Sequence, residues 1–417
     1  MTDIYKYAKE AYESRGVNVD HAMTALGNIK ISIHCWQGDD VAGFLNKESL
    51  SGGVAVTGNY PGAATTPDQL RADLKQALTL IPGKHKLNLH AIYADTPEKV
   101  DLDQLTPKHF EPWVGFAKEE SLGLDFNPTC FSHEKSSSGF TLSSSDQQTR
   151  TFWIEHVKGA RRIASYFGEQ TGQIAVNNIW IPDGYKDNPI DQLTPRQQLQ
   201  ESLDQILQEK LPHMIDAVES KLFGIGAESY TVGSHEFYLG YAIKNDTYLC
   251  LDSGHFHPTE KVSDKLSAVS LFVPGILLHV SRPVRWDSDH VVILDDELQN
   301  IANQLVYNHL LEKTVIGLDF FDASINRVAA WVIGVRATQK ALLKALLQPV
   351  DALKKAEQSG DYTTRLALTE SMKDMPWGVI WEYYLSTQNT DTNWLDQVKK
   401  YEQTVLFKRE VSRCQIF

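Results

Sequence analysis

The fold of this chain is decided by three short apolar runs: Thr247-Tyr-Leu-Cys-Leu-Asp252, Gly275-Ile-Leu-Leu-His-Val-Ser281 and Val315-Ile-Gly-Leu-Asp319. Each run has the length of a buried strand and carries a carboxylate or an imidazole at or near its carboxyl end. Helical patterns separate the runs, which favours parallel strands in one sheet. Because the carboxyl ends of parallel strands meet at one edge, we expect these polar side chains to lie close together.

The earlier part of the chain continues this alternation of strands and helices. Five further runs are predicted strands: Ile29–His34, Lys86–Ile92, Gly123–Asn127, Ile174–Ile181 and Met214–Glu219. Eight strands separated by helices over about 320 residues predict an α/β fold, a closed (β/α)₈ TIM barrel with its site at the carboxyl ends of the strands. An open doubly wound sheet is the alternative. It would scatter the end-of-strand groups, and no dinucleotide-binding glycine fingerprint follows any strand.

The predicted organisation has three parts. Residues 1–27 form an N-terminal helical segment, 28–347 form the barrel that carries the site, and 348–417 form a C-terminal helical extension for subunit contacts. Between the first strand and the helix that begins at Thr66-Pro67-Asp68, the segment Gln37–Gly62 has no periodicity and is longer than an ordinary connection. We interpret it as a lid, with a disordered insert as the alternative. The serine-rich stretch Ser136–Ser145 is predicted to be a mobile connection.

The composition is that of a soluble globular enzyme, with 42% hydrophobic and 22% charged residues among 417. A net charge of −13 argues against nucleic acid or an anionic membrane as a partner. The four cysteines form no CxxC pair, and the N-terminus lacks the apolar core of a signal peptide. We therefore expect a cytoplasmic protein without a disulfide framework and without membrane spans.

Seven side chains in the second half of the chain are candidate metal ligands. They are Glu219, Asp252, His255, His279, Asp287, Asp289 and Asp319. Carboxylate oxygens mixed with imidazole nitrogens suit a divalent ion such as Mn²⁺, Mg²⁺, Co²⁺ or Zn²⁺, and seven groups exceed what one ion takes, so two ions are predicted.

Each candidate also has a structural alternative. The turn Asp252-Ser-Gly-His255 can direct both side chains to one point, or Asp252 can simply cap a helix. Asp287 and Asp289 share a face of an extended segment, or they belong to a solvated acidic turn. His279 is compatible with a core histidine, and Glu219 with a surface ion pair to Lys221. The recurrence of such groups at successive strand ends favours the metal site.

Aromatic and imidazole side chains at the ends of the first four strands can line a pocket. His34, Trp36, His90, Phe131 and Trp180 would form an apolar wall with a few polar handles, as sugar sites require, with core filling as the alternative. Asp183, three residues after Trp180, is a further candidate substrate contact.

Seven blocks of the sequence resemble the L-rhamnose isomerase family of the xylose-isomerase-like barrel superfamily, over about residues 3 to 405. They are Ile33-His-Cys-Trp-Gln-Gly-Asp-Asp40, Thr57-Gly-Asn-Tyr-Pro-Gly62, Asn88-Leu-His-Ala-Ile-Tyr93, Ala217-Val-Glu-Ser-Lys-Leu-Phe-Gly-Ile-Gly-Ala-Glu-Ser-Tyr230, Leu251-Asp-Ser-Gly-His-Phe-His-Pro-Thr-Glu260, His279-Val-Ser-Arg-Pro-Val-Arg-Trp-Asp-Ser-Asp-His290 and Gly317-Leu-Asp-Phe-Phe-Asp-Ala-Ser-Ile-Asn-Arg327. The resemblance implies a homotetramer with two divalent ions, Mn²⁺ preferred and Co²⁺, Zn²⁺ or Mg²⁺ as substitutes.

The resemblance also implies roles for the candidate residues. Glu219, Asp252, His279 and Asp319 would hold a structural ion, and His255, Asp287 and Asp289 would hold the catalytic ion. Lys221 would lie near the sugar O1 and would act in catalysis with Asp319 and His255, while the aromatic wall would line the sugar pocket.

The implied reaction is the reversible conversion of L-rhamnose to L-rhamnulose by a metal-assisted hydride shift between C2 and C1, with an enediol route as the competing mechanism. Two rival functions are a two-metal hydrolase or nuclease on the same barrel, which predicts a basic groove, and a non-catalytic sugar-binding protein, which leaves the convergent ligands without a purpose.

Overall fold

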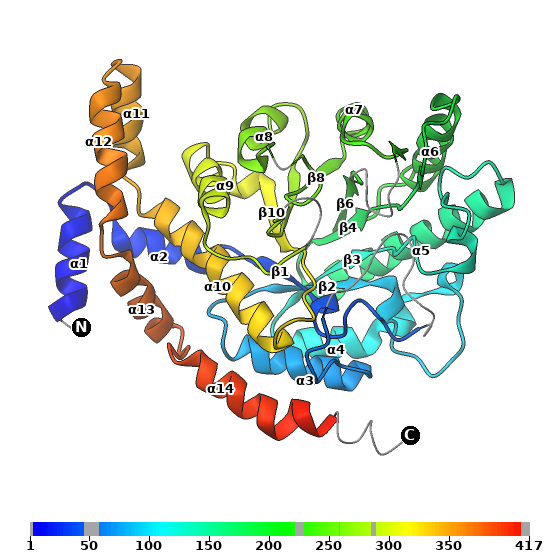
Figure 1. The fold of residues 1–417 in the computed structure, drawn as a ribbon, viewed down its shortest axis with the longest axis horizontal. Coiled ribbons are helices and arrows are strands. Elements are labelled where there is room, and N and C mark those ends of the chain that lie inside the picture. The colour runs from blue at the N-terminus through cyan, green and yellow to red at the C-terminus, as the bar shows by residue number, and fades with distance from the viewer. Residues whose placement is uncertain (1–2, 46–57, 222–228, 258, 285–288, 410–417) are drawn as a thin grey trace.

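The computed structural model describes residues 3–45, 58–221, 229–257, 259–284 and 289–409. Among these residues, eight parallel strands close into a barrel in the order β1-β10-β9-β8-β6-β4-β3-β2 (Figure 1). The barrel strands are β1 Ile31–His34, β2 Lys86–His90, β3 Gly123–Asn127, β4 Ala175–Ile179, β6 Met214–Glu219, β8 Tyr248–Asp252, β9 Ile276–Val280 and β10 Thr314–Leu318. The (β/α)₈ prediction is confirmed, and every predicted strand overlaps an observed one.

Helices surround the barrel and extend beyond it. The helices are α1 Asp3–Glu13, α2 Val19–Asn28, α3 Pro67–Leu78, α4 Glu111–Glu119, α5 Gln147–Thr171, α6 Leu193–Ile206, α7 His235–Asn245, α8 Val262–Val269, α9 Asp296–Tyr307, α10 Arg327–Leu346, α11 Val350–Gln358, α12 Tyr362–Lys373, α13 Trp377–Thr387 and α14 Trp394–Tyr401. The predicted start of α3 is confirmed, since the Thr66 hydroxyl accepts a hydrogen bond from the Gln69 amide at 3.2 Å.

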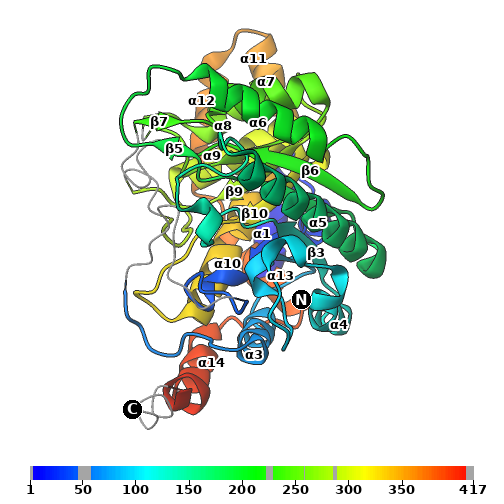
Figure 2. The ribbon, with the colours of Figure 1, turned by 90° about the vertical axis from the view of Figure 1, so that its right-hand side faces the viewer.

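Two features between β4 and β8 were not predicted. One is the helix α7, and the other is a small antiparallel pair formed by β5 Gly184–Tyr185 and β7 Tyr230–Thr231. Two-residue strands are too short to produce a period-two pattern, so only the pairing of distant segments reveals them. Figure 2 shows β5 and β7 side by side.

The strand register decides which side chains fill the barrel. Successive side chains of a strand point to opposite faces, so residues two apart share the inner face. A small apolar layer inside the barrel consists of Val176, Ala217, Cys250 and Leu277. Two residues further along their strands stand Asn178, Glu219, Asp252 and His279. The barrel interior therefore changes from apolar to polar within one step toward the carboxyl ends of these strands.

The terminal helices pack against the barrel and one another. In Figure 1, α1 lies beside α13, and the rings of Tyr5 and Tyr383 stack with centroids 3.6 Å apart. At the other end of the extension, Arg409 forms a two-bonded ion pair with the buried Asp73 of α3, with distances of 2.6 and 2.7 Å. Tyr401 donates a further hydrogen bond to Asp73 at 2.6 Å. Figure 2 shows α14 close to α3.

The C-terminal segment also contacts the last described part of the predicted lid. The Tyr60 hydroxyl donates to Glu402 at 2.6 Å. Gly62 has a φ of 92°, and a Cβ at this position would lie 2.6 Å from the Leu406 Cβ, so only glycine fits without displacing the helix. Residues 46–57 lie outside the described residues, and the lid interpretation stays a prediction.

In the part of the chain that the structure describes, no helix is both long and apolar enough to cross a bilayer. Cys35, Cys130 and Cys250 are buried free thiols there.

Candidate active site

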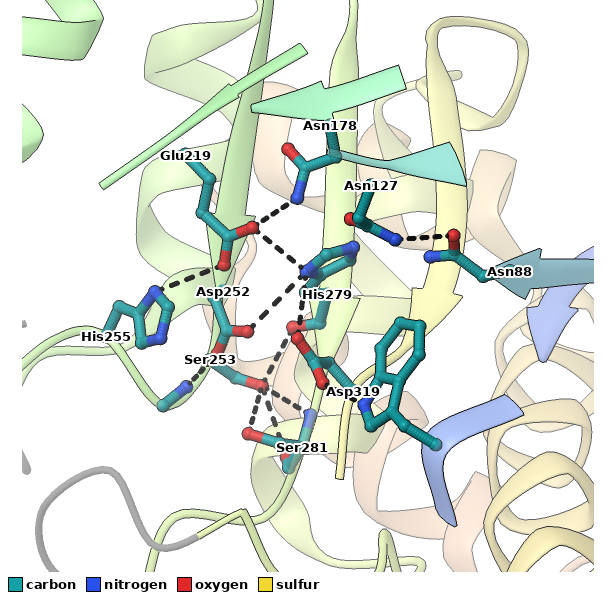
Figure 3. Close-up of polar contacts among 12 residues, drawn as sticks. Asn88, Asn127, Asn178, Glu219, Asp252, Ser253, His255, His279, Ser281 and Asp319 are labelled. Carbon is teal, nitrogen blue, oxygen red and sulfur yellow. Dashed lines mark hydrogen bonds and ion pairs between the residues drawn. The ribbon is translucent and has the colours of Figure 1, made fainter. Parts of the chain in front are cut away.

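Four of the predicted metal ligands meet at the carboxyl ends of four neighbouring strands (Figure 3). Glu219 ends β6, Asp252 ends β8, His279 lies in β9, and Asp319 directly follows β10. One ligand atom from each residue lies within 4.8 Å of all the others. The His279 Nδ1 is 3.4 Å from Glu219 Oε2, 3.7 Å from Asp252 Oδ2 and 3.3 Å from Asp319 Oδ2. These four residues span about a hundred positions of the sequence and form one cluster, as predicted. We call them the acidic cluster.

The electrostatics of this cluster favour a cation at its centre. Burial raises the pKa of the Asp252 carboxyl, because an ionised group without water is costly. Burial alone would lower the pKa of His279, but the nearby carboxylates of Glu219 and Asp319 raise it well above the ordinary value. In the absence of an ion, a proton on His279 thus provides the positive charge that the three carboxylates attract. A divalent ion would provide more.

Several buried polar atoms around the cluster make no hydrogen bond within the described residues. They are both ring nitrogens of His34 and of His279, the Asp252 Oδ2, the Asn178 Oδ1 and the Trp180 Nε1. Buried polar groups are normally hydrogen-bonded, and the exceptions need an explanation. Here the exceptions include oxygen and nitrogen atoms of the ligand types that divalent metals take, so the donor set fits such an ion.

The second predicted ion site is described only in part. The His255 Nδ1 lies 3.2 Å from Glu219 Oε1, so His255 stands beside the first cluster. The turn that brings it there is held by the Gly254 amide, which donates to Asp252 Oδ1 at 2.6 Å. The carbonyl of Asp289 accepts a hydrogen bond from the Phe321 amide at 3.2 Å, which places this backbone close to the end of β10. Asp287 lies outside the described residues.

The five residues predicted to form the pocket wall are in contact as one chain of rings. His34 and Trp36 have ring centroids 5.3 Å apart, and Trp36 and His90 are 4.6 Å apart. The chain continues from His90 to Phe131 at 5.7 Å and from Phe131 to Trp180 at 5.8 Å. All four contacts are edge-to-face, the geometry that aromatic rings prefer. These residues end β1 and β2 or follow β1, β3 and β4 within four residues.

Two polar side chains of this wall, Trp36 and His90, have hydrogen-bond partners within the protein. The indole Nε1 of Trp36 donates to Asp319 Oδ1 at 3.0 Å, so the wall is joined to the acidic cluster. The Nδ1 of His90 lies 2.9 Å from the Thr129 hydroxyl. Burial lowers the pKa of both His34 and His90 to about 4, so both imidazoles are neutral at neutral pH. A neutral imidazole can donate to and accept from sugar hydroxyls.

Comparison with known proteins identifies the family. Residues 1–409 of the chain match the sequence model of the L-rhamnose isomerase family. It is 60% identical to L-rhamnose isomerase from Listeria monocytogenes (serotype 4b, strain F2365) over 410 residues, which cover 97% of this chain and 98% of the relative. The chain belongs to the L-rhamnose isomerase family.

A second relative agrees with this assignment. L-rhamnose isomerase from Salmonella gallinarum is 60% identical over 414 residues, covering 98% of this chain and 99% of the relative. A solved structure of L-ribulose 3-epimerase is similar with a TM-score of 0.47 and 10% identity, covering 79% of this chain and 98% of that chain. The family match and the two L-rhamnose isomerase relatives make the chain an aldose–ketose isomerase of the L-rhamnose isomerase family, and the hydrolase alternative finds no support.

The Asp183 carboxylate is bound by the serine-rich stretch. This carboxylate is buried and accepts four hydrogen bonds, two from the amide and hydroxyl of Thr141 at 2.7 and 2.5 Å and two from Ser143 at 3.0 and 2.5 Å. These bonds occupy both oxygens, so Asp183 holds the serine-rich stretch. The predicted substrate contact by this carboxylate stays a prediction.

Lys221 is buried next to the same segment. Its ammonium group donates to the Pro182 carbonyl at 2.7 Å, and its amide donates to the Gly233 carbonyl at 3.0 Å. The Asp183 carbonyl in turn accepts from the Val232 amide at 3.1 Å. The position of Lys221 thus depends on the backbone that Asp183 anchors.

Sequence reasoning missed polar residues that support the cluster from the inner face. Asn178 donates from Nδ2 to Glu219 Oε2, and Asn127 donates to Asn88 at 2.7 Å (Figure 3). The Ser253 hydroxyl joins β8 to β9, accepting from the Ser281 amide at 2.8 Å. For Asn178 a signal was present, because it lies two residues before the predicted pocket residue Trp180 and so shares its face.

Proposed function

We propose that this protein interconverts L-rhamnose and L-rhamnulose in the space between the acidic cluster and the wall of rings. The observation that carries the proposal is the buried convergence of Glu219, Asp252, His279 and Asp319 next to that wall. Relatives at 60% identity over nearly the whole chain carry the name L-rhamnose isomerase. A sugar needs both surfaces, since its carbon skeleton packs on apolar rings and its oxygens need polar partners.

We propose two divalent ions, with Mn²⁺ as the preferred metal. Glu219, Asp252, His279 and Asp319 would hold the structural ion, and His255, Asp287 and Asp289 would hold the catalytic ion. When bound, the ions supply positive charge that polarises the sugar carbonyl and favours an ionised neighbouring hydroxyl.

Side chains of the protein would accept the proton from O2 and stabilise the negative charge at O1. A carboxylate or imidazole of the site, with Asp319 and His255 as the candidates, would accept the O2 proton. The hydrogen at C2 would then move with its electron pair to C1, which makes C2 the carbonyl carbon and leaves O1 to take a proton. The Lys221 ammonium would favour the negative charge that develops at O1.

The five wall residues would keep water from the moving hydrogen. Three of them, His34, Trp36 and Phe131, are at most 3% exposed, and the rings touch without a break. A dry site preserves a hydride-type transfer and strengthens every electrostatic contact. His34 and Trp180 would contact the sugar through the buried nitrogens that make no hydrogen bond in the described structure.

We further propose a cytoplasmic homotetramer in which the helices after residue 347 contact neighbouring subunits. Tyr362 and Leu366, one turn apart on α12, are 63% and 55% exposed. Exposed apolar side chains grouped in this way favour a protein contact. Sedimentation equilibrium is expected to give four chains, and replacement of both residues by serine should shift the distribution toward smaller species.

The activity is tested with a panel of aldoses, after treatment of the enzyme with EDTA and again after addition of Mn²⁺. We expect ketose formation from L-rhamnose, loss of activity with EDTA and recovery with Mn²⁺. Activity that survives exhaustive chelation would contradict the metal proposal. In D₂O, a hydride shift leaves C1 of the product free of solvent deuterium, whereas incorporation at C1 would support the enediol route.

His255 provides the sharpest single variant. His255→Ala should lower kcat by at least about a thousandfold, comparable to removing a principal catalytic group, while circular dichroism stays unchanged. His257→Ala is the matched control, because this histidine lies two residues away and its ring contacts the exposed Thr259 at 2.7 Å. Equal activity of the two variants would contradict the role of His255.

A further inference from the structure

A cysteine thiol lies directly beneath the acidic cluster. Cys250 is two residues before Asp252 on β8, so both side chains point into the barrel. In the strand register, Cys250 stands opposite Glu219 of β6 and opposite Leu277 of β9. Its Sγ, one Glu219 oxygen and one His279 nitrogen all lie within 4.8 Å of one another.

The thiol is shielded from water and enclosed by apolar neighbours. Cys250 is 1% exposed and packs with Val176, Ala217 and Leu277. Burial of this kind makes a cysteine unreactive toward bulky reagents. A small ion that enters the barrel from the carboxyl ends of its strands, past the acidic cluster, would reach the sulfur.

A second observation points to a ligand at the same place. Neither ring nitrogen of His279 makes a hydrogen bond within the described residues, although the ring is 1% exposed. One imidazole therefore faces both the carboxylates above it and the thiol below it. The two candidate groups share Glu219 and His279 and differ in the remaining ligands, which are Asp252 and Asp319 in one group and Cys250 in the other.

We propose that Glu219, Cys250 and His279 form an inner site for thiophilic divalent ions such as Cd²⁺ and Zn²⁺. This inference rests on the proposed function, because it reuses two ligands of the structural ion. Binding would replace the thiol proton by the metal, Cys–SH + M²⁺ → Cys–S–M⁺ + H⁺, without any change of oxidation state. An ion bound at this inner site would occupy Glu219 and His279. These two residues could then no longer bind the structural ion together with Asp252 and Asp319, which we call the outer position, and the isomerase would be inhibited.

The chemistry of the donors sets the selectivity between the two positions. Thiolate favours soft or borderline ions, whereas carboxylate oxygens suit Mn²⁺ and Mg²⁺. A tetrahedral Zn²⁺ with bonds of about 2.0–2.3 Å places its donor atoms roughly 3.3–3.8 Å apart. A small contraction of the three atoms is then sufficient for coordination. Mn²⁺ would stay with Asp252 and Asp319 at the outer position.

The test uses the full-length, EDTA-treated protein in a Cys414→Ser background, titrated with Cd²⁺ and followed in the ultraviolet. We expect a thiolate-to-Cd²⁺ charge-transfer band that is retained in Cys35→Ser and Cys130→Ser and lost in Cys250→Ser. Calorimetry should show at least a tenfold weaker Kd for Cd²⁺ in Cys250→Ser, and a Kd for Mn²⁺ within about threefold of the parent.

A band that persists in Cys250→Ser, or no band at saturating Cd²⁺, would overturn the inner site. The Mn²⁺ titration reports whether Cys250→Ser is folded, and Cys250→Ala provides a second variant without a hydroxyl. Failure of the proposed function is distinguishable, because a chain that shows the band but forms no ketose loses only the isomerase assignment. A chain that forms ketose but shows no band loses only the inner site.

Discussion

At the residue scale, Trp36 joins the pocket wall to the acidic cluster. Its ring contacts His34 and His90, while its indole N–H donates to Asp319 at 3.0 Å. A partner that hydrogen-bonds a metal ligand orients that ligand and influences the affinity for the ion. In the proposed function, Trp36 would combine an apolar contact surface for the sugar with an orienting bond to a candidate ligand.

Trp36→Phe separates these two contributions, because it keeps an aromatic ring and removes the N–H. We expect the Kd for Mn²⁺, measured by calorimetry, to rise about tenfold. The control is Trp113→Phe, which removes an indole bond to the Tyr93 carbonyl at 2.8 Å in a buried position outside the cluster. An equal effect of the two variants on Mn²⁺ binding would show that the Asp319 contact has no special role.

Asp39, which follows β1 in the sequence, is a buried carboxyl group. Its oxygens accept hydrogen bonds from the Tyr93 hydroxyl at 2.6 Å and from the Gly43 amide at 2.8 Å. Burial raises its pKa from 3.8 to about 7, partly opposed by these two bonds and assisted by the charge of Asp40. Because the folded-state pKa exceeds the unfolded-state value, protonation of Asp39 favours the folded state.

The sign of the pH effect follows from this difference. The stabilising contribution is fully present below about pH 3.8 and is lost as the pH rises through about 7, with a total on the order of 4 kcal/mol. Asp39→Asn removes the titration, since the amide can bond both Gly43 and Tyr93. We expect the melting temperature of the parent relative to Asp39→Asn to fall between pH 4.5 and 7.5. A constant difference over this range would contradict the assignment.

At the scale of elements, the segment after β4 is held by one side chain. Asp183 binds the serine-rich stretch through Thr141 and Ser143, and the neighbouring Pro182 carbonyl accepts from Lys221. The pairing of β5 with β7 closes the same region. The stretch predicted to be a mobile connection is therefore tied to the backbone that positions a candidate catalytic lysine.

Asp183→Ala should loosen this stretch. Loss of the carboxylate leaves the donors of Thr141 and Ser143 unpaired, at about 1–3 kcal/mol for each unsatisfied group. We expect amide exchange in residues 136–145 to accelerate about tenfold or more, and kcat to fall more than KM rises because Lys221 loses its fixed position. Ser202→Ala, which removes a single bond to the Leu142 carbonyl, is the milder control. Unchanged exchange in Asp183→Ala would refute the anchoring role.

At the scale of the whole molecule, the proposed metal binding would be coupled to folding. The cluster gathers ligands from β6, β8, β9 and the end of β10, so an ion bound there joins half of the barrel. Without the ion, three carboxylates share one imidazole, and their mutual repulsion opposes folding. An ion that binds only the folded state stabilises it by about 2.7 kcal/mol at a hundred times its Kd.

Removal of metal should therefore lower the melting temperature by a few degrees, and Mn²⁺ should restore it. The measurement is differential scanning calorimetry of the EDTA-treated protein at one fixed protein concentration. His279→Gln should have a melting temperature that responds less to Mn²⁺. A parent protein whose melting temperature is the same with EDTA and with excess Mn²⁺ would contradict a bound ion.

The amino-acid sequence by itself determined the barrel and the polar residues that meet at its rim. Strand-length apolar runs separated by helical patterns are local signals, and a side chain at the end of a parallel strand can only point to one rim. Glu219, Asp252, His279 and Asp319 were predictable for this reason. So was the wall of rings, since its members end or follow the first four strands.

Only the tertiary structure decided which partner each of these side chains meets. The bonds of Trp36 to Asp319, of Asn178 to Glu219 and of Asp183 to the serine-rich stretch join segments up to 283 residues apart. The position of Cys250 under the cluster depends on the register between β6, β8 and β9. Register and closure arise from packing of the whole barrel, and a shift of one residue would exchange the inner and outer faces of a strand. No local pattern contains that information.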